Sequence, residues 1–230
     1  VPMATTGGLP TVAVRMPSNK IAAALIRAAG GYIAAPSANR SGRPSPTVAK
    51  YVIEDLDGRV EMIIDGGFSA IGLESTIIDL SEGEPMILRP GYVTQEKMTQ
   101  VIGNVDVDRT ILDASSKQAP KAPGMKYRHY APKGNLTIVE GPQEKVAACI
   151  NEKLSEGHKQ GLKTGVIATD ETIEQYQADV KRSLGSRKNE EAIALHLFEV
   201  LRQMDDEEVQ LIFTESFACL LYTSDAADDL

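Results

Sequence analysis

Hydroxyl and amide side chains gather in the segment 36–47, directly after an expected strand. Ser37 and Asn39 come first, and Ser45-Pro46 is typical of a helix start with Ser45 as the N-cap. The free backbone N–H groups of a helix start bind phosphate well, and nearby hydroxyl groups can add hydrogen bonds. The same residues could instead only complete a turn and cap a helix, so the pattern by itself leaves both interpretations open.

Two arginines lie near the ends of expected strands. Arg15 shares one face of the expected strand 11–16 with Thr11, and Arg89 ends another strand before a Pro-Gly pair. Ligand sites in α/β proteins gather at the carboxyl ends of strands, and a guanidinium can bind a carboxylate through two hydrogen bonds. Either arginine could instead form a surface ion pair, and Ser75 could be merely the polar start of a strand.

A basic and aromatic cluster occupies residues 126–130. It carries enough charge to cover a nucleotide but too little for nucleic acid, and it could also serve solubility alone. His129 has no partner at metal-ligand spacing, because the other histidines are His158 and His196. We therefore expect no protein metal site.

Composition bounds the function. The chain has 230 residues, 42% of them hydrophobic and 24% charged, with a net charge of −8. These fractions are typical of a globular protein, and the negative charge argues against broad binding to a phosphate backbone. No stretch approaches the roughly 18 uninterrupted apolar residues of a membrane span, so we expect a cytoplasmic protein.

The periodicity of apolar residues predicts the secondary structure of the first half. Expected strands are 11–16, 32–35, 60–65, 75–80 and 86–89. Expected helices are 19–29, 45–54 and 95–102. A proline-rich stretch without periodicity, 114–132, then indicates a linker.

Strands and helices alternate after the linker, which indicates a parallel α/β layer. Expected strands are 136–140, 164–168, 179–182 and 209–213, and expected helices are 143–155, 171–176 and 190–204. This part has no Gly-rich dinucleotide motif, so we interpret it as an accessory domain.

Both ends of the sequence are unusual. Residues 1–10 are typical of a loop that precedes a strand, so we expect residues upstream of them. Residues 219–230 resemble the translation of a sequencing adaptor, so we interpret them as an artefact that is not part of either domain.

Five ordered motifs, at 11–17, 35–47, 74–78, 88–91 and 123–132, closely resemble the long, two-domain form of threonylcarbamoyl-AMP synthases. The resemblance implies an α/β fold, with a partial YrdC-like twisted mixed sheet followed by a small Rossmann-like parallel α/β domain. It implies these divisions: the later half of a YrdC-like catalytic domain at 1–113, a linker or active-site flap at 114–133, a truncated accessory domain at 134–218, and the suspected artefact at 219–230.

The resemblance also implies roles for individual residues. L-threonine would be bound by Arg15, Ala35 and Ser75. ATP would be bound by Thr11, Ser37, Ser45, Arg89 and His129. The catalytic polar cluster would contain Ser37 and Asn39.

The activity implied by the resemblance is the synthesis of threonylcarbamoyl-AMP and pyrophosphate from L-threonine, bicarbonate and ATP, with Mg²⁺, for the t6A modification of tRNA. The product would pass to a tRNA threonylcarbamoyl transferase, and direct tRNA binding is not expected. The family's Lys and Arg from its N-terminal half lie outside this chain, so we expect the fragment alone to be inactive.

Two alternatives remain at the level of sequence. The first is a non-catalytic module that binds nucleotide or double-stranded RNA, against which the acidic net charge counts. The second is a carbamoyl-transfer enzyme with a similar domain. Such enzymes carry zinc-finger-like cysteine motifs, whereas this chain has two cysteines without ligand spacing.

Overall fold

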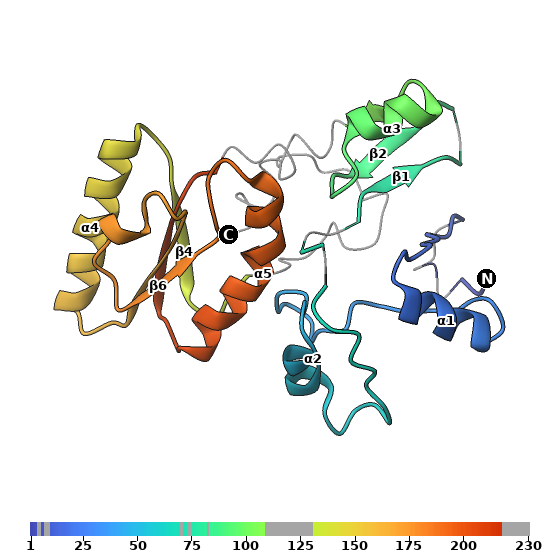
Figure 1. Cartoon of the computed structure of the whole chain (residues 1–230), viewed down its shortest axis with the longest axis horizontal. Helices are drawn as coiled ribbons and strands as arrows, with labels where there is room; N and C mark the ends of the chain where they lie inside the picture. The colour runs from blue at the N-terminus through green and yellow to red at the C-terminus, as the bar shows by residue number, and fades with distance from the viewer. Residues whose placement is uncertain are drawn as a thin grey trace.

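The computed structural model describes residues 1–3, 6, 10–69, 71–72, 75–81, 83–108 and 131–217, and these form two units (Figure 1). The N-terminal unit, up to residue 108, contains α1 (Lys20–Ala28), α2 (Ala49–Leu56), β1 (Ile77–Asp79), β2 (Met86–Arg89), α3 (Gln95–Ile102) and β3 (Asp106–Val107). The C-terminal unit, residues 131–217, contains β4 (Asn135–Val139), α4 (Gln143–Lys159), β5 (Thr164–Ala168), the 3-10 helix η2 (Ile173–Gln175), β6 (Val180–Ser183), α5 (Glu190–Asp206) and β7 (Leu211–Glu215).

The N-terminal unit has a small mixed sheet in the order β1-β2-β3. β1 and β2 are antiparallel with Ile78 opposite Ile87, and β2 and β3 are parallel with Ile87 opposite Val107. Helix α3 connects β2 to β3, as a parallel pair requires, and begins where the Thr94 hydroxyl accepts a hydrogen bond from the Lys97 N–H.

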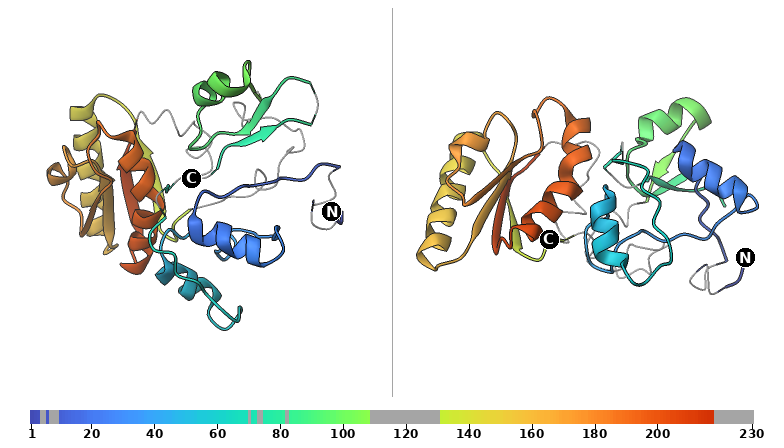
Figure 2. Two further views of the ribbon diagram at one scale, coloured as in Figure 1. Left: turned by 45° about the vertical axis from the view of Figure 1, so that its right-hand side comes forward. Right: turned by 60° about the horizontal axis from the view of Figure 1, so that its bottom comes forward.

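The C-terminal unit has a parallel sheet in the order β4-β7-β5-β6. Helices α4 and α5 cover its opposite faces (Figures 1 and 2). Successive residues of β5 point to opposite faces, so Val166 joins the core under α4 and Ile167 joins the core under α5. The expected architecture, a mixed sheet followed by a parallel α/β layer, is therefore confirmed.

Helix α5 is buried on more than one side. Towards the sheet it packs Phe198, Leu201 and Met204, whereas the side chain of Arg202 is also fully buried and points to the N-terminal unit. Figure 1 shows α5 lying between the parallel sheet and α2. The helix is thus part of one core and of the contact between the two units.

Three expected strands of the N-terminal unit are wrong. Segments 11–16, 32–35 and 60–65 pair with no other strand among the described residues. A strand needs a neighbour to satisfy its backbone hydrogen bonds and cover its apolar face. Here the apolar side chains face solvent instead, with Met16 96% and Met62 76% exposed.

None of the helices in the described ranges combines the length and apolarity that crossing a membrane requires.

Candidate active site

The structure brings together two of the predicted site residues, Ser75 and Arg89. Register places Arg89, at the end of β2, opposite Ile77 at the start of β1. The Arg89 side chain donates to the Ser75 carbonyl from Nε at 3.3 Å and from Nη2 at 2.8 Å. A residue predicted to bind ATP therefore fixes the backbone of a residue predicted to bind threonine.

The residue after Ser75 fixes the loop that follows β2. The Thr76 hydroxyl donates to the Val93 carbonyl at 2.6 Å and accepts from the Val93 N–H at 3.1 Å. This reciprocal pair holds the Pro-Gly segment after Arg89 against the start of β1. The end of β2 is consequently restrained on both sides of the arginine.

The second part of the site is residues 37–47, which we call the candidate nucleotide segment. Asn39 closes a turn within it, because its Nδ2 donates to the carbonyls of Arg40 and Arg43 at 3.1 and 3.0 Å. The Arg43 N–H also donates to the Arg40 carbonyl, and Gly42 adopts a φ of 85° that favours glycine. Asn39 thus shapes the turn that lies between Ser37 and Ser45.

The expected N-cap at Ser45 is wrong. Helix α2 begins at Ala49, its N-cap is Val48, and no side chain caps it. Ser45 is partly buried and precedes the helix by a full turn, and the following Thr47 carbonyl instead accepts from the Ser69 N–H at 2.9 Å. The helix start therefore lies four residues beyond Ser45, which leaves the Ser45 hydroxyl without that structural role.

Some polar atoms of the candidate nucleotide segment are buried without a hydrogen-bond partner among the described residues. They are Asn39 Oδ1, Arg43 Nε and Thr47 Oγ1. Buried polar side-chain atoms are satisfied in most folded proteins. This segment accordingly retains unused hydrogen-bonding capacity.

Four other predicted residues lie on exposed chain outside helices and strands: Thr11, Arg15, Ala35 and Ser37. Within the described ranges, no hydrogen bond or ion pair joins any of them to another predicted site residue. His129 lies outside the described residues, as does most of the linker 114–133. The described residues hold no group of three or more His, Cys, Asp or Glu side chains that could bind a metal.

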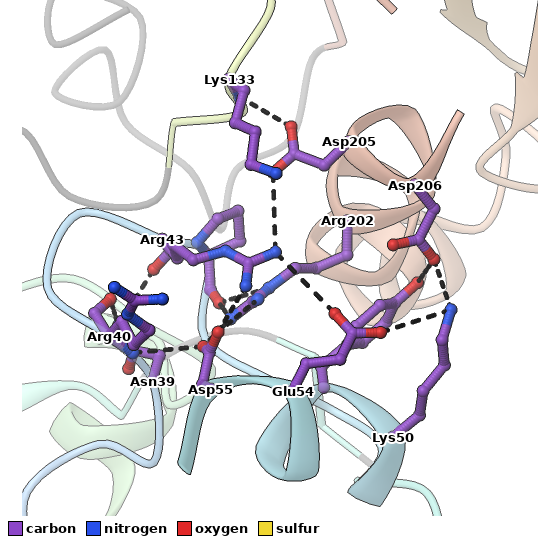
Figure 3. A network of polar contacts seen from close by, with 12 residues as sticks. Asn39, Arg40, Arg43, Lys50, Glu54, Asp55, Lys133, Arg202, Asp205 and Asp206 are labelled. Carbon is purple, nitrogen blue, oxygen red and sulfur yellow. Dashed lines mark hydrogen bonds and ion pairs between the residues drawn. The ribbon is translucent and has the colours of Figure 1, made fainter. Parts of the chain in front are cut away.

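Sequence reasoning missed the buried ionic network behind the candidate nucleotide segment (Figure 3). Asp55, in α2, and Arg202, in α5, form an ion pair of 2.7 Å with both side chains 0% exposed. Arg202 also donates to the Pro44 carbonyl from Nε at 2.9 Å and from Nη2. Asp55 accepts in addition from the Arg40 N–H at 3.1 Å and from the Arg43 side chain.

Opposing effects act on the pKa of the Asp55 carboxyl. Burial acts to raise the pKa of the Asp55 carboxyl, but the hydrogen bonds from Arg202 and from the Arg40 N–H outweigh it and lower that pKa. Asp55 is therefore ionised in the folded protein at neutral pH.

The sequence carried no signal for this pairing. Asp55 lies in a helix, where an acidic residue usually faces solvent. Arg202 is 147 positions further along the chain. Only the packing of α5 against α2 brings them together.

Comparisons with known proteins cover the whole chain. The family model described as "Threonylcarbamoyl-AMP synthase, C-terminal domain" matches residues 93–226, and one described as "Telomere recombination" matches residues 1–91. Threonylcarbamoyl-AMP synthase of Bacillus subtilis is 46% identical over 212 residues, which are 92% of this chain and 60% of the relative. The Pyrococcus abyssi enzyme of the same name is 48% identical over 215 residues, which are 94% of this chain and 61% of the relative. The chain thus spans about three fifths of these relatives.

A solved structure is also similar. The crystal structure of Pyrococcus abyssi Sua5 complexed with L-threonine matches with a TM-score of 0.86 and 44% sequence identity. The match covers 100% of this chain and 67% of that chain.

Proposed function

The chain belongs to the threonylcarbamoyl-AMP synthase family, and from this premise we propose that the complete protein is an L-threonylcarbamoyladenylate synthase. The observation that carries the proposal is the 44% identical structure that matches the whole chain and was crystallised with L-threonine. The proposed substrates are L-threonine, bicarbonate and ATP. The product would pass to a tRNA threonylcarbamoyl transferase for t6A formation, and we accordingly propose a cytoplasmic location.

The proposed reaction has two steps. First, the threonine amine attacks the carbon of bicarbonate, and loss of water leaves a carbamate. Second, a carbamate oxygen attacks the α-phosphorus of ATP, the bond from this phosphorus to the bridging oxygen breaks, and pyrophosphate leaves. Such transfer depends mainly on positioning and charge stabilisation, which hydroxyls, backbone N–H groups and guanidiniums can supply.

We assign the residues of this chain to the two ligands as follows. Arg15 would pair with the threonine carboxylate, beside Ser75 and the backbone of Ala35. The triphosphate and nucleoside would contact Thr11, Ser37, Ser45, Arg89 and His129. Ser37 and Asn39 would form the polar cluster near the reacting groups.

The contact between Arg89 and the Ser75 carbonyl supports a shared site, because it holds one proposed ATP residue beside one proposed threonine residue. Mg²⁺ would accompany the triphosphate, since this ion is held mainly by substrate phosphates and water in ATP-using sites.

We further propose the domain limits 1–113 and 134–218, with residues 114–133 as a flap over the nucleotide. The flap has a direct test in limited proteolysis. Slower cleavage at this segment with ATP and L-threonine present supports it, and an unchanged rate contradicts it.

Pyrophosphate release by the complete protein tests the function. We expect release that requires L-threonine, bicarbonate, ATP and Mg²⁺ together and that stops when any one is omitted. The RNA-binding alternative makes the opposite prediction: no release, with filter binding of double-stranded RNA that weakens steeply as salt rises.

A further inference from the structure

Two residues of α5 contact the candidate nucleotide segment: Asp205 lies 4.0 Å from the Arg43 guanidinium, and the fully buried Arg202 makes the closer contacts. Arg202 uses Nε and Nη2 on the Pro44 carbonyl and Nη1 and Nη2 on the Asp55 carboxylate. Its planar guanidinium presents these donors in a fixed arrangement, so the position of α5 determines the position of Pro44.

The Pro44 carbonyl has a direct geometric relation to Ser45. Carbonyl oxygen and the next N–H belong to one planar peptide group. Fixing the oxygen on Arg202 therefore orients the N–H of Ser45, which is one of the residues proposed to contact ATP.

The other end of the same turn is fixed by the same ion pair. Asp55 accepts from the Arg40 N–H at 3.1 Å, and Arg40 directly follows Asn39. The stretch from Asn39 to Ser45 is thus held at both ends by Asp55 and Arg202, as Figure 3 shows for the labelled side chains. A lysine could not replace Arg202 here, because its single ammonium group lacks the fork that reaches both acceptors.

Helix α5 is a suitable reference for this purpose. Its residues Phe198, Leu201 and Met204 are locked in the core against the parallel sheet. The last turn of the helix also binds the end of the linker, because the Asp205 carboxylate accepts from the Lys133 N–H at 2.7 Å. Movement of the candidate nucleotide segment relative to α5 would break the buried contacts that Arg202 makes with the Pro44 carbonyl and with Asp55.

We infer that Arg202 is a positioning residue for ATP, which holds the candidate nucleotide segment through the Pro44 carbonyl and the Asp55 carboxylate. This inference rests on the proposed function. It assigns the C-terminal unit a part in ATP binding, although none of its described side chains is proposed to touch ATP.

Steady-state kinetics of the complete protein test the inference. In Arg202→Lys, loss of one charge-assisted hydrogen bond should raise the KM for ATP by about tenfold. The KM for L-threonine should stay near the wild-type value, because Arg15, Ala35 and Ser75 lie outside the held segment. A purely structural role would lower the folded fraction and leave both KM values unchanged.

A double variant separates positioning from stability. Breaking a buried ion pair by changing one partner is strongly destabilising, whereas replacing both partners with apolar residues is often neutral. Arg202→Met with Asp55→Leu should therefore unfold at a temperature closer to that of the wild type than Arg202→Met alone does, because it leaves no unpaired carboxylate, and it should still show the raised KM for ATP.

The Lys50–Asp206 pair provides the matched control. It joins the same helices, α2 and α5, at 2.5 Å, but its lysine side chain is 61% exposed, and its ion-pair partners among the described residues, Asp206 and Glu54, lie outside the candidate nucleotide segment. Lys50→Met should leave both KM values unchanged.

The outcomes distinguish the inference from the function on which it rests. A wild-type KM for ATP in both Arg202→Lys and the stable double variant overturns the inference alone. A wild-type protein that releases no pyrophosphate overturns the proposed function and the inference with it. A raised KM for ATP in both variants, with Lys50→Met unchanged, supports the inference.

Discussion

Individual residues in the candidate active site divide into those that would touch ligands and those that fix the backbone. Arg15 and Ser37 are exposed and are proposed only to contact ligands, whereas Asn39 and Arg89 also bind backbone carbonyls. Sequence motifs indicated the residues of both groups by resemblance. They gave no indication that Arg89 would hold the Ser75 carbonyl, because that contact depends on the register between β1 and β2.

Arg15→Ala should weaken binding of L-threonine more than binding of ATP. The proposed pair with the threonine carboxylate is a charge-assisted interaction worth about 1.5–3 kcal/mol, which corresponds to roughly 10- to 100-fold in affinity. Ser75→Ala should act in the same direction but more mildly. Calorimetric titration of each ligand into the complete protein measures both effects.

Arg27→Ala is the control for Arg15, because Arg27 is an exposed arginine in the last turn of α1. Both ligand affinities should remain at the wild-type value in this variant. An unchanged threonine affinity in Arg15→Ala would remove Arg15 from the site.

Asp55 should make the stability of the folded protein depend on pH in the acid range. Its pKa is lowered in the folded state from the ordinary value of 3.8. The stability that the ionised carboxylate contributes is therefore fully present above pH 3.8 and is lost as the pH falls through the lower, folded-state pKa. Asp55→Asn, which leaves Arg202 buried without a counter-charge, should cost about 3–5 kcal/mol at neutral pH.

Urea unfolding at a series of pH values checks this prediction. The stability difference between wild type and Asp55→Asn should shrink as the pH falls below the ordinary value of 3.8. Asp57→Asn is the control, because Asp57 directly follows α2 and is exposed. This variant should change the free energy of unfolding little. If the difference in the free energy of unfolding stays constant down to about pH 2, the pKa of Asp55 is not lowered in the folded protein.

The elements of the C-terminal unit followed from periodicity far better than those of the N-terminal unit. The expected strand 164–168 matches β5, and the expected helix 190–204 differs from α5 by two residues. Each of these segments buries its apolar residues within the unit, so the local pattern and the packing agree. In the N-terminal unit, the helix 95–102 matches α3, but the strands 11–16 and 60–65 have no pairing partner in the described chain.

Two features could not be read from periodicity. The two-residue strand β3 is too short to show an alternating pattern. The start of α2 at Ala49 instead of Ser45 depends on Pro44 and Thr47 being buried against other parts of the fold. Tertiary contacts thus overrode a typical Ser-Pro helix start.

The contact of α5 with the segment before Ser75 should tolerate no side chain at Gly72. A Cβ at this position would lie 2.1 Å from the carbonyl oxygen of Leu195 and 2.5 Å from that of Ala194. Both neighbours are backbone atoms of α5, so Gly72→Ala should force a backbone shift and cost about 1–3 kcal/mol. Thermal unfolding monitored by circular dichroism measures the effect.

Gly66→Ala is the matched control, because a Cβ there would meet only the Ile21 side chain at 3.7 Å. This variant should be neutral or slightly stabilising. Equal unfolding temperatures for the two alanine variants would contradict the close approach of residue 72 to α5.

Helix α5 joins the two units of the molecule. It is part of the core of the C-terminal unit, and it contacts the N-terminal unit. The parallel sheet fixes the helix, Arg202 binds the Pro44 carbonyl of the N-terminal unit, and Gly72 lies against the backbone of α5. The N-terminal unit supplies almost every proposed ligand contact. We therefore expect the C-terminal unit to help position ATP in the proposed reaction.

We propose that the adenylate made by the complete protein contains both threonine and the carbon of bicarbonate. Pyrophosphate release alone would not distinguish this reaction from simple adenylation of the threonine carboxylate, which releases pyrophosphate too. Mass spectrometry of the adenylate that the complete protein forms from isotopically labelled bicarbonate distinguishes the two reactions. We expect threonylcarbamoyl-AMP that carries the labelled carbon, whereas an unlabelled threonyl adenylate, or no adenylate, would contradict the proposed function.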